Sequence, residues 1–110
     1  ELIALCNLYV ASVSTTIQWA TACGTPVVNY DVYRCRLQDF TGIPGVVTME
    51  EQEEFRAVLR RITDDRDYYD ALASHQSASS DYWGRLDGHA GDRIIGLFDH
   101  LIAGYGGGKP

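Results

Sequence analysis

The sequence has few basic residues and no long hydrophobic run. Its 110 residues include 9 lysines and arginines against 15 aspartates and glutamates, so its formal net charge is −6. Because nucleic acids and anionic membranes are bound by basic surfaces, we expect no general affinity for either. No apolar stretch approaches the ~20 residues that cross a bilayer, and the amino end lacks the basic-then-apolar order of a secretory signal. The sequence therefore predicts no transmembrane segment.

Cysteine is also scarce, and its spacing argues against two kinds of site. Cys6, Cys23 and Cys35 form an odd set with no C-x-x-C pair and no zinc-site spacing. We therefore expect no metal centre, and the set favours a reducing, cytoplasmic setting. Cys6 and Cys23 have apolar neighbours, and free cysteine in such surroundings packs as a small hydrophobic residue.

The first half of the chain has the pattern of a strand, a helix and a second strand. Residues 8–13 are almost continuously apolar, which is typical of a strand covered on both faces of a parallel sheet. Residues 14–16 offer hydroxyls that suit a helix start, and apolar residues then recur at helical spacing until Gly24. Residues 25–30 begin with a proline and continue through two valines as a second strand. The first six residues resemble the last turns of a helix, so we expect a C-terminal piece of a longer protein.

The second half predicts one more strand and then helices. Residues 31–45 lack a sustained period and are typical of a functional loop that can include a helical turn. Residues 45–48 are a third strand candidate, and the capping-box pattern of residues 48–51 predicts a helix start, followed by an apolar face. This face comprises Phe55, Val58, Leu59 and Ile62. Residues 66–103 predict helices that pack on the sheet, and 104–110 a flexible tail.

These patterns together predict an α/β fold. We expect a partial, Rossmann-like parallel sheet of about three strands within residues 1–65, with helices on both faces and a helical C-terminal extension. In such sheets ligands bind beyond the carboxyl ends of the strands, so the loops 13–16 and 31–36 should share one rim. A helix that starts at Thr15 would direct N–H groups at a phosphate, and the hydroxyls of Ser14, Thr15 and Thr16 would add hydrogen bonds. The simpler alternative is that Ser14 only caps the helix.

A family resemblance supports the phosphate interpretation. The pattern Ser14-Thr15-Thr16-x-x-Trp19-Ala20-x-Ala22-Cys23-Gly24-x-Pro26-Val27-Val28 resembles the C-terminal nucleotide-binding half of GT-B fold glycosyltransferases, over residues 7–31. The resemblance implies two Rossmann-like domains, of which this one would hold the nucleotide diphosphate of a sugar donor. Many members have a glutamate that binds the donor ribose where Trp19 stands here, and Gln18 is a possible substitute.

The next segment is similar to a second group with the same arrangement. Asn29-Tyr30-Asp31-x-Tyr33-Arg34-x-Arg36 looks like the corresponding loop of CDP-glycerol glycerophosphotransferase-type enzymes. We therefore include Asp31, Tyr33, Arg34 and Arg36 among the candidate donor-binding residues. Either arginine could neutralise a departing diphosphate, and the equal alternative is that both pair with Asp31 and Asp39.

The sequence thus predicts the donor-binding part of a glycosyltransferase that acts in bacterial polysaccharide synthesis. Its partners would be a nucleotide-diphosphate sugar, as substrate rather than cofactor, and an N-terminal domain of the same chain, in the cytoplasm or at the inner face of the membrane. No catalytic base is visible, and none of the three histidines has a metal-ligand pattern. Three alternatives remain open: a UDP-sugar 2-epimerase, a polyol-phosphate transferase, and a noncatalytic α/β interaction module.

Overall fold

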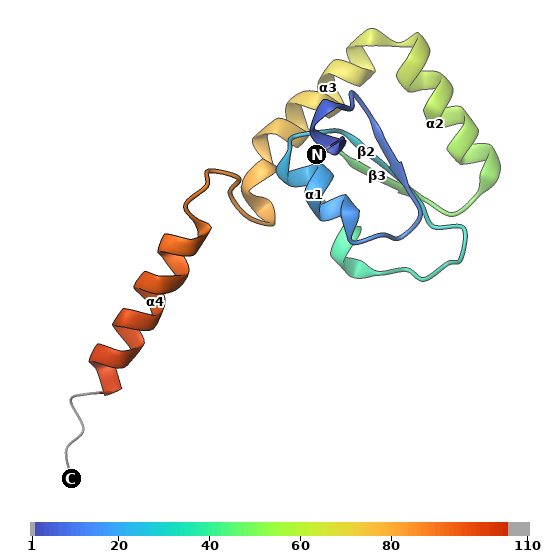
Figure 1. Cartoon of the computed structure of the whole chain (residues 1–110). Helices are drawn as coiled ribbons and strands as arrows, with labels where there is room; N and C mark the ends of the chain where they lie inside the picture. Colours follow the sequence, from blue (N-terminus) through green and yellow to red (C-terminus); the bar gives the residue numbers. More distant parts are fainter. Residues whose placement is uncertain (1, 106–110) are drawn as a thin grey trace.

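A parallel sheet of three strands organises the molecule. The computed structural model describes residues 2–105, except for the side chain of Asp39. The strands lie in the order β1 (Tyr9–Ala11), β2 (Val27–Tyr30) and β3 (Val46–Met49) (Figure 1). Val27 lies opposite both Tyr9 and Val46. The predicted α/β fold with three parallel strands is therefore confirmed.

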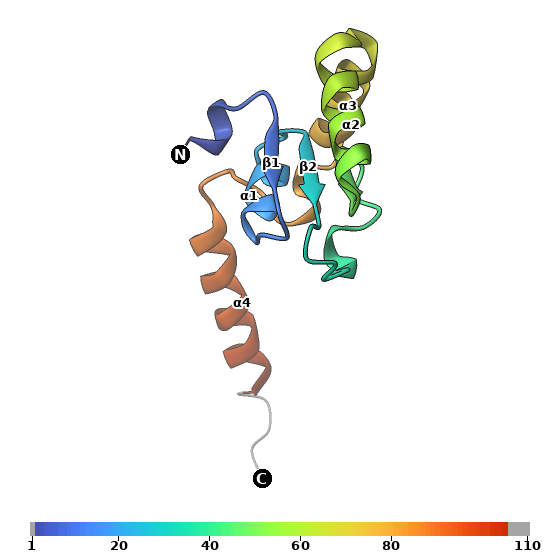
Figure 2. The same ribbon diagram turned by 90° about the vertical axis from the view of Figure 1, so that its right-hand side faces the viewer.

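Helices cover both faces of the sheet, as predicted. Helix α1 (Thr16–Ala22) packs on one face, and helices α2 (Gln52–Asp64) and α3 (Arg66–Ala78) pack on the other (Figure 2). Adjacent residues of β2 point to opposite faces, so the sheet separates two cores. The core on the α1 side contains Ile17, Ala20, Val27 and Phe40. The core on the α2 and α3 side contains Val28, Met49 and Ile62, with the predicted apolar face of α2 around them.

The amino-terminal region departs from the sequence pattern. The strand expected over residues 8–13 is limited to Tyr9–Ala11, and Val10 is 46% exposed. Strand β1 lies at the edge of the sheet, and the side chain of Val10 is only partly covered. The expectation of a strand covered on both faces was therefore wrong. A single 3-10 turn, Ile3–Leu5, stands where a helix end was expected. Cys6 and Cys23 are exposed rather than packed.

The junction between β3 and α2 also differs from the prediction. Pairing of Tyr30 with Met49 extends the parallel ladder through Thr48, so Thr48 belongs to a strand and cannot cap a helix. Helix α2 starts at Gln52 after Glu51, without a side-chain cap. The capping box was therefore misplaced. Asp65 provides a cap instead at the next helix, where its carboxylate accepts a hydrogen bond from the N–H of Tyr68 at 3.0 Å.

The end of α3 joins the two layers of the fold. Gln76 is fully buried, and its Nε2 atom donates to the carbonyl of Thr21 in α1 at 3.5 Å. A Cβ atom added to Gly45 would lie 2.5 Å from the Cβ of Gln76, so glycine is needed for this close approach. The chain continues through a 3-10 turn, Ser80–Tyr82, to Trp83, whose ring centroid lies 6.5 Å from that of Phe40. This segment holds α1 and α3 together.

The last helix projects away from the body of the molecule. Helix α4 (Ala90–Tyr105) has no buried residue and extends away from the sheet and the other helices (Figure 1). It gives the chain a radius of gyration of 18.5 Å, against roughly 13 Å for a compact domain of this size. The flexible tail was predicted to begin at Gly104, but Gly104 and Tyr105 are the last two residues of this helix. Residues 106–110 of the predicted tail lie outside the described residues. Among helices within residues 2–105, none has the length and apolar character needed to span a membrane.

Candidate functional site

The loops that follow all three strands meet in one pocket. It lies at the carboxyl edge of the sheet and has a volume of about 240 Å³. Its lining residues are Val13, Asn29, Asp31, Arg36, Leu37, Gln38, Thr41, Thr48 and Glu50. Val13 and Arg36 thus share one rim, as expected for the ends of parallel strands. Seven of these nine residues have polar or charged side chains, which offer hydrogen-bond donors and acceptors to a ligand.

Asn29 connects the three strand ends beneath this pocket. This side chain is 3% exposed, and its Oδ1 atom accepts a hydrogen bond from the N–H of Val13 at 3.0 Å. Its Nδ2 atom donates to the Oγ1 atom of Thr48 at 3.4 Å, and that hydroxyl donates to the carbonyl of Phe40 at 3.4 Å. The floor of the pocket is therefore fixed by a short chain of hydrogen bonds that crosses from β1 to β3.

Asp31 fixes the loop that forms the wall of the pocket. This residue is 2% exposed, and its two carboxylate oxygens accept hydrogen bonds from the N–H groups of Cys35 and Arg36, at 2.9 and 2.7 Å. Carboxylates that accept backbone N–H groups form stronger hydrogen bonds than neutral acceptors do. Asp31 therefore positions the loop backbone, and in the described part of the chain no arginine side chain is hydrogen-bonded to it.

Unusual backbone conformations are concentrated at this rim. Within residues 2–105, three residues other than glycine have positive φ angles: Val13 at 49°, Arg34 at 53° and Arg36 at 52°. For a β-branched residue such as valine this conformation is a clear outlier. Strained residues of this kind cluster at ligand sites, where the surrounding structure holds them in place. The N–H groups of Val13 and Arg36 donate hydrogen bonds to Asn29 and Asp31, and these bonds provide that constraint here.

The two arginines pair with glutamates that follow β3. The guanidinium of Arg36 donates two hydrogen bonds to Glu50, at 2.8 and 3.1 Å, and Arg34 donates to Glu51 at 2.6 Å. The hydrogen bond from Arg36 lowers the pKa of Glu50 and raises that of Arg36. These partners replace Asp31, and the side chain of Asp39 lies outside the described part. A phosphate would therefore have to share or displace Glu50 and Glu51.

The three hydroxyls after β1 have different surroundings. The Oγ1 atom of Thr16 lies 2.6 Å from the Tyr9 hydroxyl and 2.7 Å from the Oγ atom of Ser14, and Ser14 Oγ also accepts from the N–H of Thr16 at 3.3 Å. These two side chains are therefore linked to each other and to β1. Thr15 is exposed and forms no side-chain cap on α1. Of the three, it is the one whose side chain faces solvent.

Six of the eight candidate donor-binding residues do not line this pocket: Ser14, Thr15, Thr16, Gln18, Tyr33 and Arg34. Gln18 lines a separate depression with Trp19 and Trp83, on the outer side of α1. Tyr33 is 78% exposed and does not line the carboxyl-edge pocket. Of the eight candidates, the structure therefore places two, Asp31 and Arg36, in the pocket, together with Val13.

Sequence reasoning missed five polar residues of this site. Asn29 and Thr48 lie one residue before the ends of β2 and β3, Glu50 follows β3, and Gln38 and Thr41 lie between β2 and β3. Asparagine is depleted in strands, so its place between two apolar β-branched residues and a tyrosine was a usable signal. Thr48 was predicted both to end the third strand and to start a helix, and Glu50 was assigned to the helix start, which concealed the place of Glu50 beside the end of β3.

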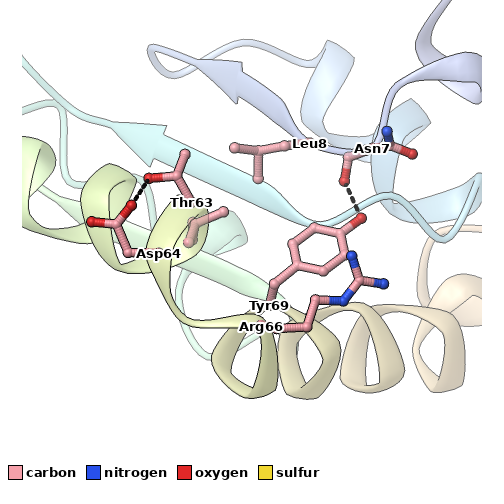
Figure 3. Close-up of a pocket in the computed structure, with 7 residues that line it drawn as sticks. Asn7, Leu8, Thr63, Asp64, Arg66 and Tyr69 are labelled. Carbon is pink, nitrogen blue, oxygen red and sulfur yellow. Dashed lines mark hydrogen bonds between the residues drawn. The ribbon is translucent and has the colours of Figure 1, made fainter.

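A second pocket lies at the opposite edge of the sheet. It has a volume of about 440 Å³ and is lined by Asn7, Leu8, Ile62, Thr63, Asp64, Arg66 and Tyr69 (Figure 3). The Tyr69 hydroxyl donates to the carbonyl of Asn7 at 2.8 Å, and the guanidinium of Arg66 lies 5.4 Å from the Tyr69 ring centroid. Because Asn7 and Leu8 precede β1, this pocket is at the amino edge and shares no residue with the carboxyl-edge pocket.

The comparisons with known proteins identify no family for this chain. No family model matches the sequence, and no significant match was found among curated proteins or solved structures. Across residues 2–105 there is also no cluster of three or more histidine, cysteine, aspartate or glutamate residues that could hold a metal ion. Function must therefore be inferred from the pocket itself.

Proposed function

We propose that this chain is the donor-binding part of a glycosyltransferase of the GT-B arrangement. The substrate would be a nucleotide-diphosphate sugar, bound at the carboxyl edge of the sheet, and the process would be bacterial polysaccharide synthesis. The observation that supports this proposal is the convergence of all three strand ends on one pocket that contains polar and charged side chains, at the place where open parallel sheets bind nucleotides. The resemblance of residues 7–31 to that enzyme class supports a nucleotide-diphosphate sugar as the ligand.

In this proposal, different residues of the site bind the hydroxyl groups and the diphosphate of the donor. Asn29, Thr48 and the carboxylate of Glu50 accept or donate hydrogen bonds in the manner that ribose and sugar hydroxyls require. The diphosphate would lie toward Thr15 and the guanidinium of Arg36, whose planar donors suit phosphate oxygens. Arg36 would exchange one of its two hydrogen bonds to Glu50 for a phosphate oxygen. Charge that develops on the leaving diphosphate would thereby be stabilised. A catalytic base would come from another domain.

The test is a titration of the 110-residue chain with UDP, GDP, CDP and inorganic diphosphate, followed by NMR. We expect shifts of the backbone amides of residues 13–16 and 31–41 with at least one nucleotide. The variant Arg36→Gln should weaken binding about tenfold, because a charge-assisted hydrogen bond is lost. Arg56→Gln is the matched control, since Arg56 pairs with Glu53 on the surface of α2.

Thr15→Val tests the phosphate contact more cleanly than a change at Thr16. Thr16 is hydrogen-bonded to Tyr9 and Ser14, so its replacement would also alter the structure. Loss of nucleotide affinity in Thr15→Val with an unchanged fold supports the proposal. Amide shifts confined to residues outside the two loops, or equal binding by Arg36→Gln and Arg56→Gln, would refute it.

One observation favours a second candidate, a noncatalytic interaction module. Arg34 and Arg36 are already neutralised by Glu51 and Glu50, so the rim offers no unpaired arginine to an anion. Absence of binding by every nucleotide and by diphosphate would select this candidate. A preference for CDP would instead favour polyol-phosphate transfer, and epimerase activity on a UDP-sugar by the full-length enzyme would select the 2-epimerase.

A further inference from the structure

Helix α4 has an apolar surface that nothing in the described chain covers. Seven large apolar side chains of this helix are 48–88% exposed: Ile94, Ile95, Leu97, Phe98, Leu101, Ile102 and Tyr105. A helix with an apolar face this wide normally packs that face against another surface. At about 100 Å² for each side chain, this surface offers roughly 700 Å² to a partner. A specific interface of standard size needs roughly 800 Å² from each side.

The order of these residues matches the pattern of a two-helix seam. Ile94, Phe98, Leu101 and Tyr105 are spaced by four, three and four residues, so they form one stripe along the helix. Ile95, Leu97 and Ile102 lie at the two sides of this stripe. The charged residues of α4 lie on the opposite side, together with Gly96 and Ala103. They are Asp92, Arg93, Asp99 and His100.

From this pattern we infer that two copies of the chain associate through antiparallel α4 helices. The stripe is symmetric about the midpoint between residues 99 and 100. An antiparallel second copy therefore places Tyr105 opposite Ile94, and Leu101 opposite Phe98. At the two sides, Ile95 lies near Ile102 of the second copy, and Leu97 near Gly104. A larger side chain thus meets a smaller one in most layers, as close packing requires, and no charge is buried.

Charge and local structure argue against two other ways of covering α4. Helices that lie on membranes are rich in lysine and arginine, whereas α4 has one arginine, Arg93, which Asp87 binds at 2.7 Å. Folding back onto the exposed Trp19 and Leu86 would require the start of the helix to turn. Asp87 opposes this turn, because it binds the guanidinium of Arg93 and the N–H of His89, the latter at 3.0 Å. A second copy requires neither change.

Sedimentation equilibrium of the whole 110-residue chain tests this inference. We expect a concentration-dependent dimer, and Leu101→Glu should raise its dissociation constant at least about 100-fold, because two carboxylates would enter the seam. Ala103→Glu is the matched control: it adds the same charge on the opposite side of the same helix and should leave the dimer intact. Circular dichroism of both variants verifies that their helix content is equal.

The orientation has its own test. Phe98→Lys and Leu101→Glu should each be monomeric alone, and an equal mixture should restore dimers, because lysine at 98 faces glutamate at 101 only in the antiparallel arrangement. Failure of the mixture to associate would overturn the antiparallel order. A chain that is monomeric at every concentration, that binds to vesicles through α4, or that dimerises equally well as Leu101→Glu would overturn the inference itself.

Discussion

The close contact between Gly45 and α3 makes a sharp prediction about stability. Gly45 has a φ of +82°, and an added Cβ would lie 2.5 Å from the Cβ and 2.7 Å from the Cα of Gln76. Alanine in this left-handed conformation costs about 1–2 kcal/mol, and the overlap with a packed helix costs about 1–3 kcal/mol more. Gly45→Ala should therefore lower the free energy of unfolding by about 2–5 kcal/mol. This is a large share of the roughly 5–15 kcal/mol typical of a domain.

Gly42 provides a matched control for the conformational part of this cost. Its φ is +79°, and an added Cβ would have no atom within 4 Å. Gly42→Ala should therefore cost only about 1–2 kcal/mol. Urea unfolding followed by tryptophan fluorescence and circular dichroism measures both variants. The difference between them isolates the packing of Gln76 on Gly45.

The outcome separates a contact with α3 from an effect of the turn alone. We expect the urea midpoint of Gly45→Ala to lie about 1 M below that of Gly42→Ala, at an m-value of about 1–3 kcal/mol/M. A Gly45→Ala chain that does not fold, beside a folded Gly42→Ala chain, agrees with this expectation. Equal midpoints for the two variants would refute the reasoning, since the close approach of α3 would then have no energetic weight.

Two further predictions concern charged residues. Asp31→Ala removes the acceptor for two N–H groups and should lower the free energy of unfolding by about 2–4 kcal/mol. Hydrogen exchange at the amides of Cys35 and Arg36 should accelerate. Unchanged protection of these amides would show that the carboxylate does not hold the loop. The hydrogen bond from Arg93 lowers the pKa of Asp87 from 3.8 to about 2, so its stabilising effect should be present above pH 3.8 and be lost as the pH falls toward 2. NMR titration should show the pKa of Asp87 rising toward 3.8 in Arg93→Gln, and an unchanged value would contradict this assignment.

Local patterns were sufficient to predict the core of the fold. The first strand, helix α1 and the second strand follow one another with a clear change from continuous apolar residues to helical spacing, and Gly24 ends the helix with a φ of +74°. The apolar face of α2 was predicted equally well, because the helical spacing of its apolar residues is sufficient to define it. These features depend on residues that are neighbours along the chain.

The errors arose where distant residues determine the structure. Thr48 has the local pattern of a helix cap, but pairing of β3 with β2 keeps it in a strand. Arg34 and Arg36 were weighed against nearby aspartates, whereas their partners Glu51 and Glu50 lie 17 and 14 residues away. The exposure of β1 and of Cys23 likewise depends on which elements cover them. Sequence periodicity has no information about such contacts.

The carboxyl-edge pocket is built entirely from one continuous stretch of the chain. All of its lining residues fall between Val13 and Glu50, whereas α4 begins only at Ala90. Substitutions in the last helix can therefore change how copies assemble without altering the ligand chemistry, and evolution can adjust the two properties separately. A version shortened after Trp83 would keep every wall of the pocket, which makes it a convenient unit for transplanting this site into another α/β scaffold.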